Sequence, residues 1–259
     1  MTIVVIGGTG LIGTRVVALL EAAGHAVVAA SRETGVNSFT GDGLAAALDG
    51  AEVLIDVSNS SYTDEAGAAE FFETSTLNLL TFGAAAGVGH HVALSVVGID
   101  RLATTQRGYF RAKAVQEMLL RDSGRPYSIV HATQFFEFLR SIADAAGTVP
   151  AGRGRRRYEV RVADALVQPM AADDVARAVV SVSLGRPLGA IDEFAGPERA
   201  PLGDFVRRAL AAADDPREVA ADPLARYFGD LLEPGELLPG PAATLAPTRF
   251  ADWLGADRD

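Results

Sequence analysis

Short apolar runs alternate with amphipathic stretches along the first half of the chain, and this alternation predicts a parallel β-sheet. The apolar runs are continuous and rich in β-branched residues, as buried strands are. Strands are predicted over residues 3–6, 26–30, 53–57, 92–97 and 127–132, and helices over residues 11–23, 65–86 and 108–121. Such alternation is typical of an α/β fold whose doubly wound parallel sheet is covered on both faces.

The pattern changes beyond about residue 138. A stretch rich in glycine and arginine over residues 147–157 predicts a loop or hairpin, followed by a strand over 166–170 and a helix over 172–183. We expect one domain over residues 1–259, in which the chain from about residue 147 to residue 259 forms a smaller lobe that covers the substrate. The arginines of the loop either are simply solvated or form a lid that attracts an anionic substrate. They are Arg153, Arg155, Arg156 and Arg157.

Composition narrows the partners. The chain has 259 residues and a formal net charge of −10, which disfavours binding to nucleic acid or anionic membranes. It has no cysteine, so disulfides and thiolate metal sites are excluded, and its four histidines lack metal-ligand spacing, so no metal is expected. No apolar run reaches the ~20 residues of a membrane span, and the first residues do not resemble a secretory signal. We expect a cytoplasmic monomer or homodimer that acts on a small molecule.

A glycine turn follows the first predicted strand directly and opens the first predicted helix. Gly7 permits a tight turn, Gly10 removes a side chain where a pyrophosphate must approach, and Gly13 allows the helix to pack closely on the strand. The helix N-terminus then offers unpaired N–H groups to phosphate. This context predicts a Rossmann-type dinucleotide site. The residues expected to contact the cofactor here are Gly7, Thr9, Gly10, Leu11, Ile12 and Gly13.

The end of the second predicted strand bears on the choice between NADP and NAD. An acid at this position would bind the ribose 2′-hydroxyl of NAD, but the strand ends in Ser31 and Arg32, with Glu33 next. Arg32 can pair with a 2′-phosphate and Ser31 can hydrogen-bond to it. We therefore expect NADP as the cofactor, with NAD less favoured; the alternative is that Arg32 is only a solvated loop charge.

Tyr109 and Lys113 are four residues apart on a predicted helix and so share one face. A nearby ammonium lowers the pKa of a phenol, which suits the tyrosine to acid/base catalysis. Ser95, at the carboxyl end of a predicted central strand, could hold a substrate carbonyl or hydroxyl. Lys113 is the only lysine of the chain and could also reach the nicotinamide ribose. By contrast, His131 lies in a predicted core strand and is expected to be a buried histidine with a satisfied hydrogen bond rather than a base.

The chain resembles an atypical short-chain dehydrogenase/reductase of the NmrA-like type. The motifs that carry the likeness are GGTGLIG over residues 7–13, TGD over 40–42, LSVVG over 94–98, GYFRAK over 108–113, ATQF over 132–135 and QPMAADDVA over 168–176. The resemblance implies that Asp42 lies near the adenine and that Ser58 and Asn59 line the cofactor groove. It also implies that Thr133 and Phe135, with Gln134 between them, lie beside the nicotinamide and the substrate.

Three functions remain open at this point. The first is an NADP-dependent oxidoreductase that acts on a small carbonyl or alcohol through Ser95, Tyr109 and Lys113. The second is a non-catalytic NADP(H) sensor that binds a partner protein, as many NmrA-like proteins that lack the catalytic tyrosine are. The third is an epimerase or isomerase that retains its cofactor. The presence of both Tyr109 and Lys113 favours catalysis.

Overall fold

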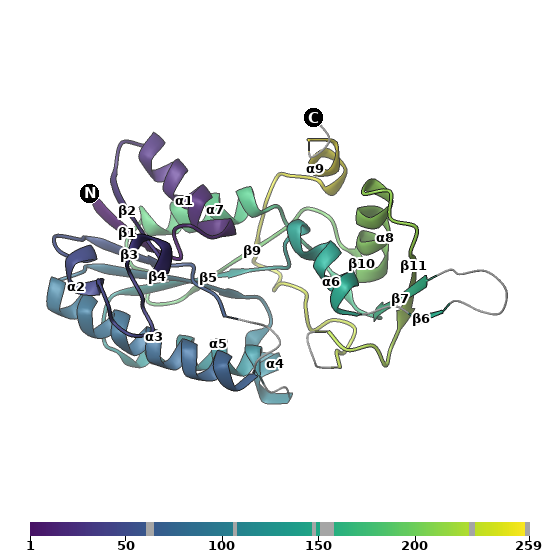
Figure 1. The fold of residues 1–259 in the computed structure, drawn as a ribbon, viewed down its shortest axis with the longest axis horizontal. Helices are drawn as coiled ribbons and strands as arrows, with labels where there is room; N and C mark the ends of the chain where they lie inside the picture. The colour runs from purple at the N-terminus through teal and green to yellow at the C-terminus, as the bar shows by residue number, and fades with distance from the viewer. Residues whose placement is uncertain (61–64, 106–107, 147–148, 151–157, 228–230, 257–259) are drawn as a thin grey trace. The chain divides into compact units, whose positions relative to one another are not determined.

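The computed structural model (Figure 1) describes residues 1–60, 65–105, 108–146, 149–150, 158–227 and 231–256. The chain forms two compact units. The first unit comprises Met1–Ala132 and Ala172–Phe194, and the second comprises Thr133–Ala171 and Ala195–Asp259. The four arginines of the predicted loop, Arg153 and Arg155 to Arg157, lie outside the described residues.

A parallel sheet forms the centre of the first unit. Its strands run in the order β9-β5-β4-β3-β1-β2, and each neighbouring pair is parallel. They are β1 (Thr2–Ile6), β2 (Ala26–Ala30), β3 (Val53–Asp56), β4 (His90–Val96), β5 (Tyr127–Ala132) and β9 (Ile191–Ala195). The chain starts at β1 in the interior of the sheet and winds outward in both directions, so the predicted doubly wound fold is confirmed.

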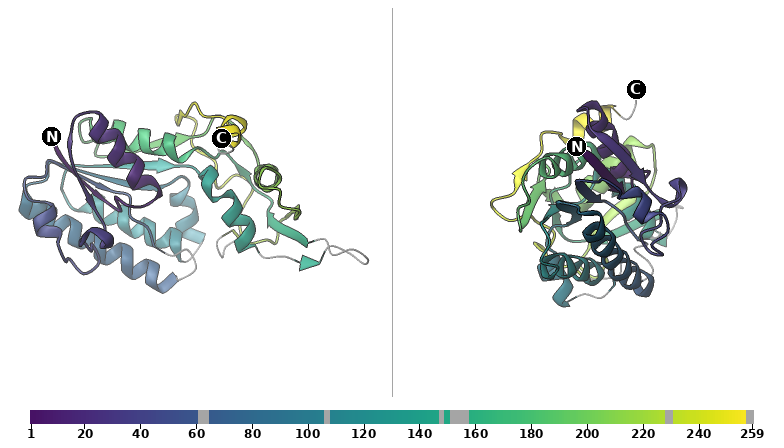
Figure 2. Two further views of the ribbon diagram at one scale, coloured as in Figure 1. Left: turned by 45° about the horizontal axis from the view of Figure 1, so that its top comes forward. Right: turned by 90° about the vertical axis from the view of Figure 1, so that its left-hand side faces the viewer.

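Helices cover both faces of this sheet (Figure 1). The helices α1 (Leu11–Ala22) and α7 (Ala172–Ser183) pack against each other on one face. On the other face, α3 (Glu65–Ala86) and α5 (Tyr109–Asp122) run side by side (Figure 2), and α4 (Ile99–Thr105) contacts α5. A short 3₁₀ turn and α2 (Leu44–Ala47) follow β2. The inner strands β1, β3, β4 and β5 are mostly buried, because helices cover both faces of the sheet.

The second unit contains two small sheets. Parallel β7 and β11, with β6 antiparallel to β7, form one sheet, and antiparallel β8 and β10 form the other. Its elements are α6 (Leu139–Ala145), β6 (Val149–Pro150), β7 (Tyr158–Ala163), β8 (Leu166–Val167), β10 (Ala200–Pro201), α8 (Leu202–Ala212), β11 (Glu218–Asp222), β12 (Thr244–Leu245) and α9 (Phe250–Ala256). Phe136, Phe205 and Phe250 lie at its core, where the Phe250 ring contacts the other two.

The sequence predicted a lobe that begins at about residue 147, and two elements beyond that point belong to the first unit instead. Helix α7 packs on β4 and β5 as well as on α1, and β9 pairs with β5. The organisation into one domain with a substrate-covering lobe stays a prediction. Within the described residues, no helix has both the length and the apolar character needed to cross a bilayer.

Candidate active site and cofactor site

The glycine turn lies between the carboxyl ends of β1 and β2. The amides of Gly7 and Gly8 both donate to the carbonyl oxygen of Ala30, at 2.9 and 3.2 Å. The α1 ladder begins with the Thr14 amide, which donates to the Gly10 carbonyl at 3.0 Å. The amides of the first helical turn before Thr14 have no intrahelical acceptor, as at any helix N-terminus. They are therefore available to an anion, which the helix dipole also favours.

Added side-chain atoms would meet very different surroundings at the three glycines. A Cβ on Gly13 would lie 2.0 Å from the Gly7 carbonyl oxygen, and a Cβ on Gly7 would lie 2.9 Å from the Ser58 amide nitrogen. Both positions are closed by backbone. A Cβ on Gly10 would meet only the Gly7 oxygen, at 3.3 Å, among the described residues. Beside the helix N-terminus, Gly10 thus borders an open space, and this cradle fits a dinucleotide diphosphate.

The turn after β2 presents Ser31 and Arg32. The Ser31 amide donates to the Thr34 hydroxyl at 2.9 Å, and that hydroxyl donates to the Ala29 carbonyl at 2.9 Å. The Ser31 hydroxyl has no hydrogen-bond partner within the described part of the chain, and Arg32 is exposed. The end of β2 thus carries a buried hydroxyl, with no partner among the described residues, and an exposed guanidinium.

Three further residues predicted to line the cofactor groove also belong to the first unit. Asp42 is exposed and accepts a hydrogen bond from the Thr40 hydroxyl at 2.6 Å. Asn59 is exposed, and its side-chain oxygen accepts from the Ser60 amide. Ser58, two residues after the end of β3, adjoins Gly7 of the glycine turn. The structure therefore brings Ser58 and the glycine turn together.

Thr133 and Phe135 belong to the second unit. The Thr133 hydroxyl donates to the Gln168 carbonyl at 2.7 Å, and the Phe135 ring stacks on Phe138 with 5.4 Å between centroids. These contacts are internal to the second unit. The predicted role of both residues beside the nicotinamide stays a prediction.

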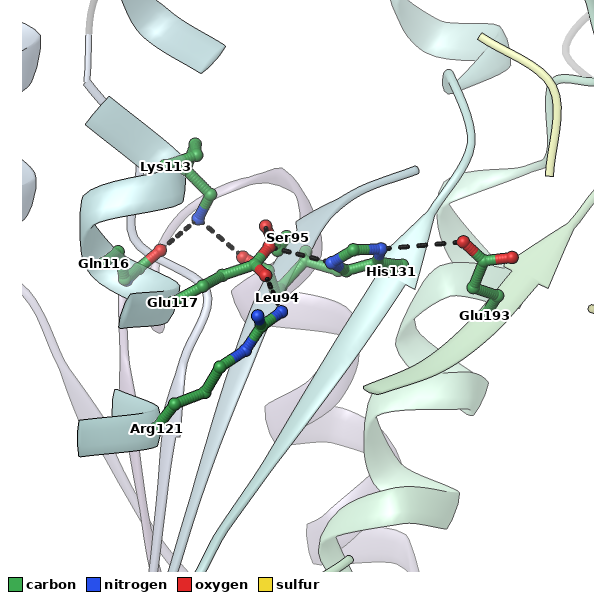
Figure 3. Close-up of polar contacts among 8 residues, drawn as sticks. All are labelled: Leu94, Ser95, Lys113, Gln116, Glu117, Arg121, His131 and Glu193. Atoms are coloured by element: carbon green, nitrogen blue, oxygen red, sulfur yellow. Dashed lines mark hydrogen bonds and ion pairs between the residues drawn. The ribbon is translucent and has the colours of Figure 1, made fainter. Parts of the chain in front are cut away.

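Lys113 points inward from α5 (Figure 3). Its side chain is 2 % exposed. The Nζ donates to the Leu94 carbonyl at 2.7 Å and to Gln116 Oε1, and it lies 4.6 Å from the centroid of the Phe72 ring. Burial lowers the pKa of Lys113 to about 8, against the negative charges of Asp56 and Glu117, which raise it. The ammonium therefore titrates close to physiological pH.

Tyr109 lies one helical turn before Lys113 and packs on the same aromatic ring. The Tyr109 and Phe72 rings meet edge to face with 5.9 Å between centroids, and Phe110 flanks the other side at 5.7 Å. The tyrosine is half-buried. Phe72 of α3 thus contacts both members of the predicted pair, which holds them on one side of α5.

Ser95 belongs to a second buried network (Figure 3). Its hydroxyl donates to Glu117 Oε1 at 2.5 Å, and His131 Nε2 lies 2.8 Å from the same oxygen. The other carboxylate oxygen accepts from Arg121 at 2.8 Å. Burial raises the pKa of Glu117, but hydrogen bonds from His131 and Ser95 and the charges of His131 and Arg121 outweigh burial and lower it below its usual range.

His131 is therefore a buried core histidine with a satisfied hydrogen bond, as expected. In the sheet register Ser95 lies beside His131, and His131 lies beside Glu193 of β9. The His131 Nδ1 is 3.7 Å from Glu193 Oε1. The Ser95 hydroxyl and the Lys113 ammonium consequently lie in two different networks. These networks adjoin because Leu94 and Ser95 are neighbours on β4, and Gln116 and Glu117 are neighbours on α5.

Three polar residues of these networks were not predicted from the sequence: Asp56, Gln116 and Glu117. Each is buried. Asp56 Oδ1 accepts from the Ser58 amide at 3.0 Å and from its hydroxyl at 2.6 Å, and Oδ2 accepts from Gln116 Nε2 at 2.8 Å. The available signals were the spacing of Gln116 and Glu117, three and four residues after Lys113, and an acid that ends an apolar strand.

The first part of the chain matches the model of a known protein family. Residues 3–107 match the model of the NAD dependent epimerase/dehydratase family. The photosystem II assembly factor Ycf39 of Cyanophora paradoxa is 30% identical over 153 residues, which are 54% of this chain and 47% of that protein. This chain thus spans about half the length of that relative.

Solved structures with the same fold cover nearly the whole chain. MoeE5 in complex with UDP-glucose and NAD has a TM-score of 0.74 at 17% identity, covering 100% of this chain and 99% of that one. DesIV, the dTDP-glucose 4,6-dehydratase of Streptomyces venezuelae with NAD and TYD bound, has a TM-score of 0.69 at 19% identity, covering 99% and 95%. The UDP-glucose 4-epimerase of Thermus thermophilus in complex with NAD scores 0.65 at 18% identity, covering 90% and 91%. At these identities the likeness establishes the Rossmann-type fold.

Proposed function

We propose that this chain is an NADP-dependent oxidoreductase of the atypical, NmrA-like short-chain type, acting on a small carbonyl or alcohol. The observation that carries the proposal is the cradle at Gly10, beside the start of α1, where an added Cβ would meet only the Gly7 oxygen among the described residues. The match to a family named for its dependence on NAD supports a dinucleotide as the ligand of that cradle.

The preference for NADP rests on the end of β2. Arg32 is exposed there, so its guanidinium can bind a 2′-phosphate. The neighbouring Ser31 hydroxyl is buried and has no partner within the described residues. The solved relatives named above hold NAD. The strand end of this chain has a hydroxyl and then a guanidinium where an NAD-binding strand end has an acid.

When bound, the nicotinamide supplies or accepts the hydride. Tyr109 then gives a proton to the substrate carbonyl oxygen, or takes one from the substrate hydroxyl. Lys113, with a pKa of about 8, is mostly protonated at neutral pH. Its positive charge would stabilise a phenolate at Tyr109, and its third N–H, beyond the two given to Leu94 and Gln116, would hold the ribose. The Ser95 hydroxyl already donates a hydrogen bond to Glu117. Its lone pairs can therefore accept a hydrogen bond from a substrate hydroxyl and orient it.

A second function has one specific observation in its favour. The family model that matches residues 3–107 is named for epimerases and dehydratases, and two of the solved relatives are a sugar-nucleotide epimerase and a sugar-nucleotide dehydratase. An enzyme of that kind returns the hydride to its substrate and consumes no cofactor. The same cradle and the same Tyr109 serve either reaction.

The test is consumption of NADPH with a panel of small aldehydes and ketones. Replacing Tyr109 by Phe removes only the hydroxyl, and we expect kcat to fall by about 10²-fold or more while the Kd for NADPH stays within about threefold. The matched control is Tyr127→Phe, because the Tyr127 hydroxyl donates to the Gly189 carbonyl at 2.9 Å, away from the candidate site. We expect this variant to keep full activity.

Each other outcome identifies a different function. Full turnover by the Tyr109→Phe variant contradicts the assignment of the proton donor. Conversion of sugar nucleotides without net loss of NADPH identifies the epimerase. Tight binding of NADPH without turnover of any substrate identifies a cofactor sensor.

A further inference from the structure

Gln116 lies between a buried cation and a buried anion. Its side chain is 1 % exposed. Its Oε1 accepts from the Lys113 ammonium, and its Nε2 donates to Asp56 Oδ2 at 2.8 Å. A primary amide has one acceptor end and one donor end. Only one orientation of the Gln116 amide therefore satisfies both neighbours, and Asp56 selects that orientation.

Asp56 also holds the loop that follows β3. Its Oδ1 accepts two hydrogen bonds from Ser58, one from the amide and one from the hydroxyl. Ser58 in turn adjoins Gly7 of the glycine turn. A continuous set of contacts thus runs from the turn expected to hold the diphosphate, through Asp56 and Gln116, to the Lys113 ammonium.

We propose that Gln116, oriented by Asp56, is a positioning residue that fixes the place and the charge of Lys113. This inference rests on the proposed function, in which Lys113 acts on Tyr109 and on the cofactor ribose. A lysine side chain has many rotamers. The amide oxygen of Gln116 and the carbonyl of Leu94 restrict them to one that keeps Nζ on the Phe72 ring. Gln116 also links Lys113 to the Asp56 carboxylate by hydrogen bonds, and the negative charge of that carboxylate favours the charged amine.

Replacing Asp56 by Asn should reverse the Gln116 amide. The Ser58 amide and hydroxyl both need an acceptor, so the new amide oxygen stays with them and its NH₂ faces Gln116. Two NH₂ groups cannot hydrogen-bond to each other, and Gln116 relieves this by turning its own oxygen toward position 56. Its NH₂ then faces the Lys113 ammonium, which loses an acceptor and a nearby negative charge and becomes easier to deprotonate.

The single lysine of the chain makes this measurable. Protein grown on ¹³C-lysine gives one lysine Cε resonance, from Lys113, and its titration yields the pKa of that residue in the full-length protein without substrate. We expect a midpoint of about 8 for the wild-type protein. Asp56→Asn and Gln116→Leu should each lower the midpoint by about one pH unit. Gln116→Glu keeps an acceptor for Lys113 and should leave the midpoint at or above the wild-type value.

Asp173→Asn is the matched control. It makes the same carboxylate-to-amide change at an exposed residue that pairs with Arg15, and its Lys113 midpoint should equal that of the wild type. Thermal unfolding checks that each variant is folded. If Gln116→Leu does not fold, Asp56→Asn and Gln116→Glu still test the inference. The Lys113 midpoint should fall in Asp56→Asn and should stay equal or rise in Gln116→Glu.

Binding of NADPH and the pH profile of kcat complete the test. Asp56→Asn should raise the Kd for NADPH about tenfold. In the pH profile of kcat, the apparent pKa that is due to Lys113 should fall by the same amount as the NMR midpoint. Unchanged midpoints in both Asp56→Asn and Gln116→Leu overturn the inference while leaving the proposed function intact. If the midpoints of the two variants shift but the wild-type protein binds no NADP(H), the inference about Gln116 holds and the proposed function is overturned.

Discussion

The glycine turn and the buried face of α5 prepare a site in opposite ways. The turn depends on missing side chains: a Cβ would collide at Gly7 and Gly13, and the start of α1 offers amides that have no intrahelical acceptor. The inward face of α5 carries long polar side chains, and Lys113, Gln116 and Glu117 each have hydrogen-bond partners. In the proposed function, the first region recognises a ligand by shape and backbone, and the second controls the charge of one amine.

This difference predicts how each region responds to change. The turn is sensitive to volume, because its closed positions are bounded by backbone that moves little. The α5 face is sensitive to pH and to single charges, because its groups are buried in a medium that weakly screens charge. Substitutions in the turn should therefore be detected by changes in stability and ligand affinity, and substitutions on the α5 face by changes in pH dependence.

The largest effect is expected at Gly13, and Gly10 provides its matched comparison. Gly13→Ala places a Cβ 2.0 Å from the Gly7 carbonyl oxygen, so the turn must move, and the free energy of unfolding should fall by more than about 3 kcal/mol. Gly10 has φ −81°, which alanine adopts readily, and Gly10→Ala should change the free energy of unfolding by less than about 1 kcal/mol. The Gly10 variant should nevertheless bind NADPH about 100-fold more weakly, because its methyl group enters the cradle. Urea unfolding and calorimetry measure the two quantities.

Equal loss of stability in both glycine variants contradicts the cradle as described. Undiminished NADPH affinity in the Gly10→Ala variant contradicts the placement of the diphosphate.

The next effect concerns Lys113 and depends on pH. The pKa of Lys113 is about 8 in the folded chain and 10.5 in the reference state. Between these values the unfolded chain binds more protons, so the contribution of Lys113 to stability rises with pH from about 8 and levels off above 10.5. The gain amounts to about 3 kcal/mol, at about 1.4 kcal/mol per pKa unit. Lys113→Met should abolish it.

Urea unfolding of the wild-type and Lys113→Met proteins from pH 7 to pH 11 tests this, and only the difference between the two is used. The matched control is Arg111→Met, an exposed position on the same helix, where a guanidinium does not titrate in this range. A difference between wild type and Lys113→Met that is independent of pH would show that the pKa of Lys113 is not lowered in the folded chain.

The two regions also differ in how far the sequence reveals them. The glycine turn is local: spacing, a preceding strand and a following helix lie within residues 3–23, and each part of that pattern corresponds to an observed contact. The predicted helices over 65–86 and 172–183 and the strands over 26–30 and 127–132 coincide with α3, α7, β2 and β5. These elements have long apolar periodicities or clear glycine and proline boundaries, so local physics determines them.

The α5 networks depend on contacts distant in sequence. Asp56 and Gln116 are 60 residues apart, and Ser95 and Glu117 are 22 apart, so nothing local in the sequence pairs them. Strand β9 was missed for a related reason. It lies at one end of the sheet within the first unit and carries the acidic pair Asp192 and Glu193, so it lacks the continuous apolar run that identified the inner strands.

The smallest effect is expected at the end of β2, and it tests whether the cradle reads the cofactor beyond its diphosphate. Arg32→Ala removes a charge-assisted hydrogen bond to the 2′-phosphate and should raise the Kd for NADP about tenfold, which is about 1.4 kcal/mol. The Kd for NAD should stay within about threefold, because NAD has no phosphate at that position. Ser31→Ala should act in the same direction with a smaller change. Calorimetry with both cofactors measures the ratio, and Arg15→Ala is the matched control, since Arg15 pairs with Asp173 at 2.6 Å. Equal weakening of NADP and NAD by Arg32→Ala, or tighter binding of NAD by the wild type, would assign this chain the cofactor seen in its solved relatives and leave the glycine turn as the only part of the cradle that recognises the dinucleotide.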